Sequence, residues 1–289
     1  MDLKLKEYIE SCLNKQLQTE SSYNWKQVEG GSINKTYQLI SNTHLFFVKI
    51  NSTQVFENGF KEEVLGLQFL KNNTALVPEI IIEGIFENTA FLVLEWIETG
   101  KETTKFWENF AAQLVSLHQQ KSDKFGLAAS NFMGQLPQNN SFFDNFSDFY
   151  VENRLKPQVK LAFDSKKIET KHVNQFEGLY KKISEIFPKE KPSAVHGDLW
   201  HGNFMCSKNG NAVFIDPAAY FGHREADIAM TQLFGGFSEK FYKAYHEMYP
   251  LKPCFNLRNN FYHLYPLLVH LNIFGDSYLE SIENIITEF

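Results

Sequence analysis

The chain has 289 residues, of which 43% are hydrophobic and 15% are aromatic. This is enough for one large domain or two moderate ones with a buried core. The 28 lysine and arginine residues and 34 acidic residues give a net charge of −6, without a basic run. The charge therefore argues against nucleic acid or an anionic membrane as a partner, and any phosphate binding must be local.

The three cysteines, Cys12, Cys206 and Cys254, are widely spaced and lack a C-x-x-C motif. This spacing argues against a disulfide framework or a zinc site. The first residues, MDLKLKEYIE, contain no apolar signal core, and no run approaches the ~20 apolar residues of a membrane span. We therefore expect a soluble protein of the reducing cytoplasm.

The N-terminal third of the chain predicts one helix and an antiparallel sheet. Apolar residues recur at helical spacing over about the first fifteen residues, which indicates an amphipathic helix. Strand patterns follow, and we expect them near residues 25–29, 36–40, 45–50, 80–85 and 91–97.

A glycine-rich turn, G-G-S-I-N, separates the first two strands. Its glycines let the backbone approach a bound group and turn N–H donors towards it, as phosphate-binding loops do. Alone, this motif is more often a plain hairpin turn. Together with Lys49 and the 196–216 stretch described below, it predicts nucleotide contacts from Gly30, Gly31, Ser32 and Asn34.

Lys49 ends an apolar strand, F-F-V-K, and a lysine in such a strand needs an acidic partner or a phosphate. In the helix expected over residues 55–70, Phe60, Glu63 and Leu67 share one face, so Glu63 should point inward. We predict a Lys49–Glu63 ion pair that holds the ammonium against nucleotide phosphates. The alternative is that Lys49 reaches water from an edge strand and Glu63 is a surface acid.

The pattern becomes mostly helical near Glu95–Gly100. We place the boundary between an N-terminal nucleotide-binding lobe, residues 1–97, and a C-terminal catalytic lobe, residues 98–289. The second lobe should contain a long loop at 121–143, then helices over about 144–162 and 168–187. In a two-lobed kinase the crossing segment binds the adenine, which here predicts contacts from Glu95, Trp96 and Ile97, although Trp96 is equally suited to packing.

The stretch H-G-D-L-W-H-G-N, residues 196–203, is too rich in glycine and polar residues for a helix and should form a loop. Two short strands, 204–206 and 212–215, form a predicted hairpin that brings Asp216 beside this loop. The order of His196, Asp198, Asn203 and Asp216 matches the catalytic loop and metal-binding aspartate of kinases.

Each residue of this set has an expected role. Asp198 would accept the proton of a substrate hydroxyl as a general base. Asn203 and Asp216 offer the oxygen ligands that Mg²⁺ prefers. An H-G-D turn and an aspartate at a strand end are each common alone, but their joint spacing favours phosphoryl transfer from ATP with Mg²⁺.

Taken together, these motifs resemble the fructosamine kinase / ketosamine-3-kinase family, a branch of the aminoglycoside-phosphotransferase-like kinases. The resemblance spans nearly the whole chain, and H-G-D-L-W with D-P-A-A-Y-F-G-H-R-E is its most specific part. It implies an α+β, bilobal protein-kinase-like fold, with an antiparallel sheet in the small N-terminal lobe and a larger, mainly helical C-terminal lobe. It also implies ATP-dependent phosphorylation of the 3-hydroxyl of a ketosamine, which leads to deglycation of the amine.

The same resemblance implies which residues line or support the substrate side, namely Trp200, His223, Arg224 and Glu225. For Arg224 and Glu225 the alternative is a structural role in buried ion pairs. One departure stands in the catalytic loop, because the family often has serine where this chain has His201. His201 could narrow the pocket, add a donor near the phosphates, or point to solvent.

Two other functions compete with this interpretation. The first keeps the kinase chemistry but changes the acceptor to an aminoglycoside, choline or another small alcohol. No dense acidic cluster suited to a polycationic acceptor is visible in the helical lobe. The second is a catalytically dead binding protein, which should have lost the base, a metal ligand or the lysine, and this chain retains all of them. The sugar, the kind of amine and the oligomeric state stay open.

Overall fold

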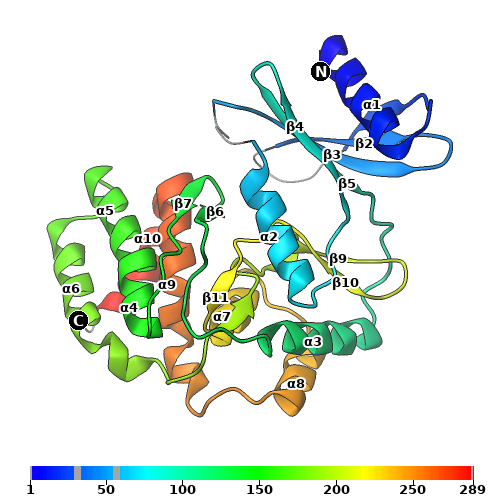
Figure 1. Cartoon of the computed structure of the whole chain (residues 1–289). Helices are drawn as coiled ribbons and strands as arrows, with labels where there is room; N and C mark the ends of the chain where they lie inside the picture. The colour runs from blue at the N-terminus through cyan, green and yellow to red at the C-terminus, as the bar shows by residue number, and fades with distance from the viewer. Residues whose placement is uncertain (1, 29–33, 55–58, 288) are drawn as a thin grey trace.

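The computed structural model describes residues 2–28, 34–54, 59–287 and 289. Its N-terminal lobe is a five-stranded antiparallel sheet with the strand order β1-β2-β3-β5-β4. Figure 1 shows this sheet, with α1 packed on it, set apart from the larger helical lobe. The strands are β1 (Asn24–Gln27), β2 (Lys35–Ile40), β3 (Leu45–Ser52), β4 (Ile80–Phe86) and β5 (Thr89–Glu95).

Helix α1 (Leu3–Leu17) confirms the predicted amphipathic helix. Its N-terminus is capped by the Asp2 side chain, and its buried residues, Leu5, Ile9 and Leu13, recur every four positions. They pack in one core with the apolar face of the sheet. This helix therefore stabilises the small lobe, and it lies apart from the helical lobe (Figure 1).

Helix α2 (Lys61–Asn72) lies between the sheet and the helical lobe (Figure 1). The expected helix over 55–70 begins too early, because Gly59, at φ +70°, and Phe60 form a turn before it. Residues 55–58 lie outside the described residues. Leu67 and Leu70 belong to the same core as the helices of the C-terminal lobe, so α2 ties the two lobes together.

The C-terminal lobe is mainly helical, which confirms the predicted α+β fold. The region expected as one helix over 144–162 contains α4, a π-helical turn at Val151–Leu155 and α5. The helices are α3 (Thr104–His118), α4 (Phe146–Tyr150), α5 (Lys156–Asp164), α6 (Thr170–Ile186), α7 (Arg224–Leu233), α8 (Glu239–Met248), α9 (Phe255–Phe274) and α10 (Leu279–Ile286). Short 3₁₀ turns lie at His201–Asn203 and Asp276–Tyr278.

The described part of the C-terminal lobe contains three short two-stranded sheets. The predicted hairpin is present as β9 (Phe204–Cys206) and β10 (Ala212–Phe214). The predicted loop at 121–143 contains a small hairpin, β6 (Asn131–Met133) and β7 (Leu136–Gln138), while β8 (Ser193–Val195) pairs with β11 (Tyr220–Gly222).

The segment between β5 and α3 is the chain's crossing from the sheet to the helical lobe. The expected boundary after residue 97 falls within it. Gly100 N donates to the Cys206 carbonyl at 2.8 Å, and Lys208 N donates to the Glu98 carbonyl at 2.7 Å. The crossing segment is thus held against the β9–β10 hairpin. Within the described ranges, no helix is long and apolar enough to span a bilayer.

Candidate active site

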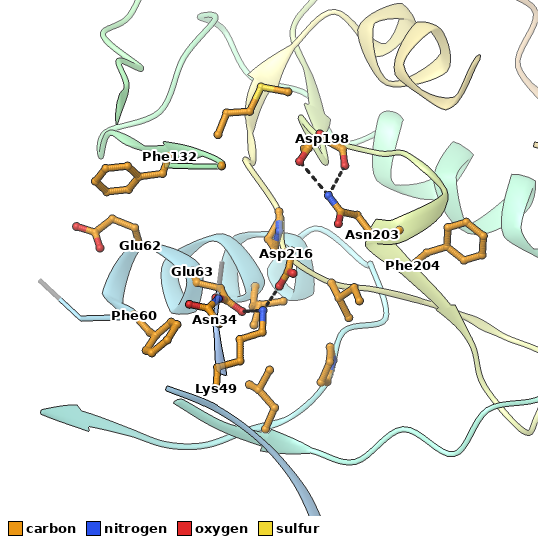
Figure 2. Close-up of a pocket in the computed structure, with 18 of the residues that line it drawn as sticks. Asn34, Lys49, Phe60, Glu62, Glu63, Phe132, Asp198, Asn203, Phe204 and Asp216 are labelled. Atoms are coloured by element: carbon orange, nitrogen blue, oxygen red, sulfur yellow. Dashed lines mark hydrogen bonds and ion pairs between the residues drawn. The ribbon is translucent and has the colours of Figure 1, made fainter. Parts of the chain in front are cut away.

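A cavity of about 880 Å³ lies between the two lobes. One wall comes from the sheet and α2, and the other comes from the catalytic loop, the β6–β7 hairpin and the end of α9. Figure 2 shows Lys49, Glu63 and Asp216 meeting at one point of this cavity, with Asp198 and Asn203 beside them. The fold thus gathers the predicted catalytic, metal-binding and lysine positions in one place.

Lys49 lies on β3, which has strands on both sides, so it is not an edge residue. Its Nζ donates a hydrogen bond of 2.8 Å to Glu63 Oε1 and also contacts Asp216 Oδ1. The lysine side chain is only 7% exposed. The predicted Lys49–Glu63 ion pair is therefore present, and it extends to an aspartate of the other lobe.

The three charges set one another's protonation. Burial lowers the pKa of Lys49, but the charges of Asp216 and Glu63 outweigh it and raise that pKa above its ordinary value. Burial raises the pKa of Glu63 to about 7, against the opposing effect of Lys49. Burial also acts to raise the pKa of Asp216, yet Lys49 holds it below its usual range. Lys49 and Asp216 are therefore fixed charges at neutral pH.

Asp198 combines one satisfied and one unsatisfied carboxylate oxygen. Asn203 Nδ2 donates to the Asp198 backbone carbonyl at 2.8 Å and to its Oδ2 at 2.9 Å. Oδ1 is buried and has no hydrogen-bond partner among the described residues. Burial raises the pKa of Asp198 to about 7. A buried oxygen without a donor can accept a proton from a bound hydroxyl.

The loop that carries Asp198 is anchored by α7. The backbone N–H groups of His196 and Gly197 donate to the buried carboxylate of Asp227, at 2.7 and 2.9 Å. Gly197 has φ +84°, and a Cβ atom there would collide with the Ala218 carbonyl oxygen. Only glycine fits this close approach. The loop of Asp198 is thus positioned by rigid backbone contacts to α7.

Asp216 lies two residues after the end of β10 and has a left-handed backbone, with φ 51°. This conformation is uncommon outside glycine, and such strain occurs often at functional sites. The neighbouring Ile215 N donates to the Asn203 carbonyl at 3.1 Å. That bond fixes the segment of Asp216 against the catalytic loop.

Asn203 and Asp216 fit a hard divalent cation. Because Asn203 Nδ2 is engaged by Asp198, its Oδ1 remains for another partner, and Asp216 adds carboxylate oxygens. Oxygen ligands with open positions for phosphate are what Mg²⁺ requires. Both residues offer hard oxygen donors and neither offers the nitrogen or sulfur that zinc prefers, so this donor set favours Mg²⁺ over zinc.

Of the residues expected near the nucleotide, Gly30, Gly31 and Ser32 lie outside the described residues. Asn34 lines the cavity, and its Oδ1 accepts a hydrogen bond of 2.8 Å from Asn51.

Glu95, Trp96 and Ile97 line the cavity at the crossing segment. The N–H groups of Glu95 and Trp96 already donate to the carbonyls of Glu79 and Leu45, at 2.9 and 3.3 Å. The Trp96 ring packs near Phe47, with centroids 6.3 Å apart. These contacts favour the packing role for Trp96. Of the three residues, Ile97 is then the one best suited to contact the adenine.

The expected substrate-side residues divide into two groups. Trp200 lines the cavity. His201, in contrast, points to solvent with a side chain 55% exposed, and its Nε2 lies 3.8 Å from Glu102. His201 therefore does not narrow the pocket.

His223, Arg224 and Glu225 are buried and do not line the cavity, so of the two expected roles, lining or supporting the substrate side, only the supporting one fits them. His223 Nδ1 lies 3.0 Å from the Tyr262 hydroxyl, and burial lowers the pKa of His223 to about 3. Arg224 donates to Glu190 and to backbone carbonyls near Pro250. Glu225 accepts two hydrogen bonds, of 2.6 and 2.7 Å, from Arg258. Arg224 and Glu225 thus form the buried ion pairs that were the structural alternative for them.

The sequence interpretation missed a second wall of the cavity, formed by the β6–β7 hairpin and the end of α9. The only early signal was a long loop with apolar residues, a type of segment that is often functional. Figure 2 shows Phe132 of this hairpin across from α2. The lining residues of this wall are Phe132, Met133, Gly134, Val269, His270, Ile273 and Phe274.

Comparison with known proteins agrees with this geometry. A ketoamine kinase, so named with the qualifier "probable", from Enterococcus faecium is 37% identical over 91% of this chain and 94% of its own length. The chloroplastic protein-ribulosamine 3-kinase of Arabidopsis thaliana is 32% identical over 91% of this chain and 81% of its own length.

The fold is shared with a solved structure from Thermobifida fusca that is named as a fructosamine-3-kinase, at a TM-score of 0.85 and 28% identity. That match covers 96% of this chain and 97% of the other. Aminoglycoside phosphotransferases have the same bilobal, protein-kinase-like fold. The sequence profile described as fructosamine kinase matches residues 5–289, and the chain therefore belongs to the fructosamine kinase family.

Proposed function

We propose that this chain is an ATP-dependent ketosamine 3-kinase, which phosphorylates the 3-hydroxyl of a sugar joined to an amine. One observation carries the proposal. Lys49, which is paired with Glu63 and Asp216, lines the same cavity as Asp198, and the buried Oδ1 of Asp198 has no hydrogen-bond donor among the described residues. Membership of the fructosamine kinase family and the names of the relatives point to a ketosamine as the acceptor.

In this proposal the transfer step is a direct displacement. The oxygen of the 3-hydroxyl forms a bond to the γ-phosphorus of ATP, and the bond from that phosphorus to the bridging oxygen breaks, which releases ADP. Asp198 Oδ1 takes the hydroxyl proton. Lys49 contributes a fixed positive charge towards the phosphates. Asn203 and Asp216 would hold Mg²⁺, which neutralises phosphate charge when bound.

The nucleotide would lie along the N-terminal lobe, and the acceptor would lie beside Trp200. Asn34 lines the cavity where the phosphates would lie, and Ile97 lines it where the adenine would lie. The product is a ketosamine 3-phosphate, which is unstable and breaks down to regenerate the amine. The result is deglycation. Because Cys12, Cys206 and Cys254 are free thiols, we place this reaction in a reducing compartment such as the cytoplasm.

The test is ATP consumption with Mg²⁺ against fructosyl-, ribulosyl- and erythrulosyl-lysine, with kanamycin and choline as controls. We expect turnover of at least one ketosamine, with the phosphate found on the 3-oxygen by ³¹P and ¹³C NMR. Phosphorylation of kanamycin or choline alone would show that the acceptor is wrong. ATP consumption without any phosphorylated acceptor would contradict the kinase assignment itself.

A further inference from the structure

His270, in the last turn of α9, lines the same cavity as Asp198. Its Nδ1 lies 2.8 Å from the Pro266 carbonyl oxygen. A carbonyl oxygen can only accept a hydrogen bond, so Nδ1 carries the proton. In the neutral ring, Nε2 then holds a lone pair that can accept a hydrogen bond.

The surroundings of His270 favour the neutral ring. The rings of Phe234, Phe274 and Tyr278 lie at centroid distances of 4.7, 5.3 and 5.1 Å from it. No carboxylate in residues 2–28, 34–54 and 59–287 forms an ion pair with this imidazole. Burial lowers the pKa of His270, although the bond to Pro266 opposes it. His270 is thus a neutral acceptor among aromatic faces.

His270 belongs to the acceptor side of the cavity. Phe234, which packs on it, also packs against Trp200 at 6.2 Å, beside the catalytic loop. The turn of the β6–β7 hairpin approaches α9, because a Cβ atom at Gly134 would lie 3.0 Å from Ile273 Cδ1. The groups assigned to the nucleotide, in contrast, lie on the N-terminal lobe.

We propose that His270 Nε2 accepts a hydrogen bond from the protonated amine of the ketosamine, within an amine-binding subsite walled by Phe274 and Trp200. The inference rests on the proposed function and names the part of the acceptor that this wall recognises. A substituted ammonium has N–H donors for a neutral imidazole, a charge that aromatic faces attract, and an alkyl chain that apolar walls accept. A polyhydroxyl chain would need several polar partners, which this wall does not provide.

The test compares two acceptors that differ in one group, 1-butylamino-1-deoxyfructose and 1-O-butylfructose. We would measure kcat/KM for each, or the inhibition constant where turnover is absent. The variants are His270→Phe, which keeps a ring but removes the acceptor, and His270→Ala, which only removes atoms. His246→Phe, exposed on α8, is the matched control. His270→Gln retains a side-chain oxygen that can accept.

For the amine, we expect both His270→Phe and His270→Ala to weaken kcat/KM by about ten- to a hundredfold, as for a hydrogen bond to a charged group. The ether should change by less than about twofold, KM for ATP should stay constant, and His270→Gln should recover part of the loss. An equal loss for both acceptors, or no loss, overturns this inference alone. A wild-type protein that acts on no ketosamine overturns the proposed function and this inference with it.

Discussion

Lys49 Nζ and Glu63 Oε1 lie 2.8 Å apart, and the same ammonium contacts Asp216 of the opposite lobe. One cation therefore joins the sheet, α2 and the strand end that carries a proposed metal ligand. Because the Lys49 side chain is almost fully buried, its ammonium is stabilised by these two carboxylates and not by water. Substitution of Lys49 should therefore test the proposed site most directly.

We expect Lys49→Ala to lower kcat/KM for ATP by about 10²–10³-fold, because a fixed positive charge near the phosphates is lost. The variant should remain folded, since the pKa of Glu63 is already about 7 and this carboxylate can take up a proton. Steady-state kinetics and a thermal melt check both points. Lys71→Ala, which breaks the exposed Lys71–Glu79 pair, is the control and should leave both quantities unchanged. Kinetics of Lys49→Ala equal to wild type would remove the lysine from the site.

Asp198→Asn should abolish phosphoryl transfer, with a loss of about 10²–10⁴-fold or more in kcat. The amide keeps the size of the side chain but cannot take the proton of the acceptor hydroxyl. ATP binding, measured by calorimetry, should remain within about twofold because the phosphate-side groups are intact. A variant that turns over near the wild-type rate would contradict the assignment of the base.

The parts of the site that share a short stretch of sequence were predictable, because local spacing decides them. Asp198, Asn203 and Asp216 belong to one loop and hairpin, and the 3.6-residue period of a helix turns Glu63 inward. The His270 wall was not predictable in this way, since it forms only when α9 meets the β6–β7 hairpin in space. Such contacts depend on packing and not on any local pattern.

Buried charge was the other point at which sequence reasoning stopped. A run such as H-R-E-A-D next to a catalytic stretch is compatible with substrate contact or with internal ion pairs. Only burial decides between them, and Glu225 is fully buried with Arg258 as its partner. The length of a loop likewise did not reveal that residues 131–138 form a hairpin, because three-residue strands carry almost no periodic signal.

Glu225→Gln should destabilise the fold by about 3–5 kcal/mol, because it leaves the Arg258 guanidinium buried without its counter-charge. Urea unfolding measures this. Glu98→Gln, which breaks the exposed Glu98–Lys208 pair, should change stability by less than about 0.5 kcal/mol. For folded Glu225→Gln, KM for the acceptor should equal that of wild type. A raised KM with unchanged stability would restore a substrate role for Glu225.

His201→Ser should alter kcat/KM for every acceptor by less than about twofold. The imidazole is 55% exposed and does not line the cavity, and its neighbours are Glu102 and the rings of Phe204 and Phe237. The replacement therefore removes no contact that a substrate could use. A change in the order of preference among ketosamines would show instead that His201 reaches the acceptor in the working enzyme.

The stability of the protein should fall in acid because of its internal histidines. Among the described residues, burial lowers the pKa of His118, His196, His223, His263 and His270, and that of His223 reaches about 3. The unfolded chain takes up these protons near pH 6.5, whereas the folded chain does not. Between pH 6.5 and the folded pKa the unfolded state thus binds more protons, so stability decreases as the pH falls.

Each such histidine contributes a slope of up to about 1.4 kcal/mol per pH unit in that window. We expect urea unfolding to show lower stability at pH 5 than at pH 7, because the five histidines outweigh the opposite effect of Glu63 and Asp198, whose pKa values are raised to about 7. His223→Phe should reduce this loss by the contribution of one histidine. Phenylalanine preserves the stacking on Phe146, whose ring centre lies 3.9 Å away, and loses only the bond to Tyr262. The exposed control His246→Phe should leave the difference between the two pH values unchanged. If His223→Phe shows the same pH dependence as wild type, the folded protein protonates His223 readily, and the acid sensitivity comes from elsewhere.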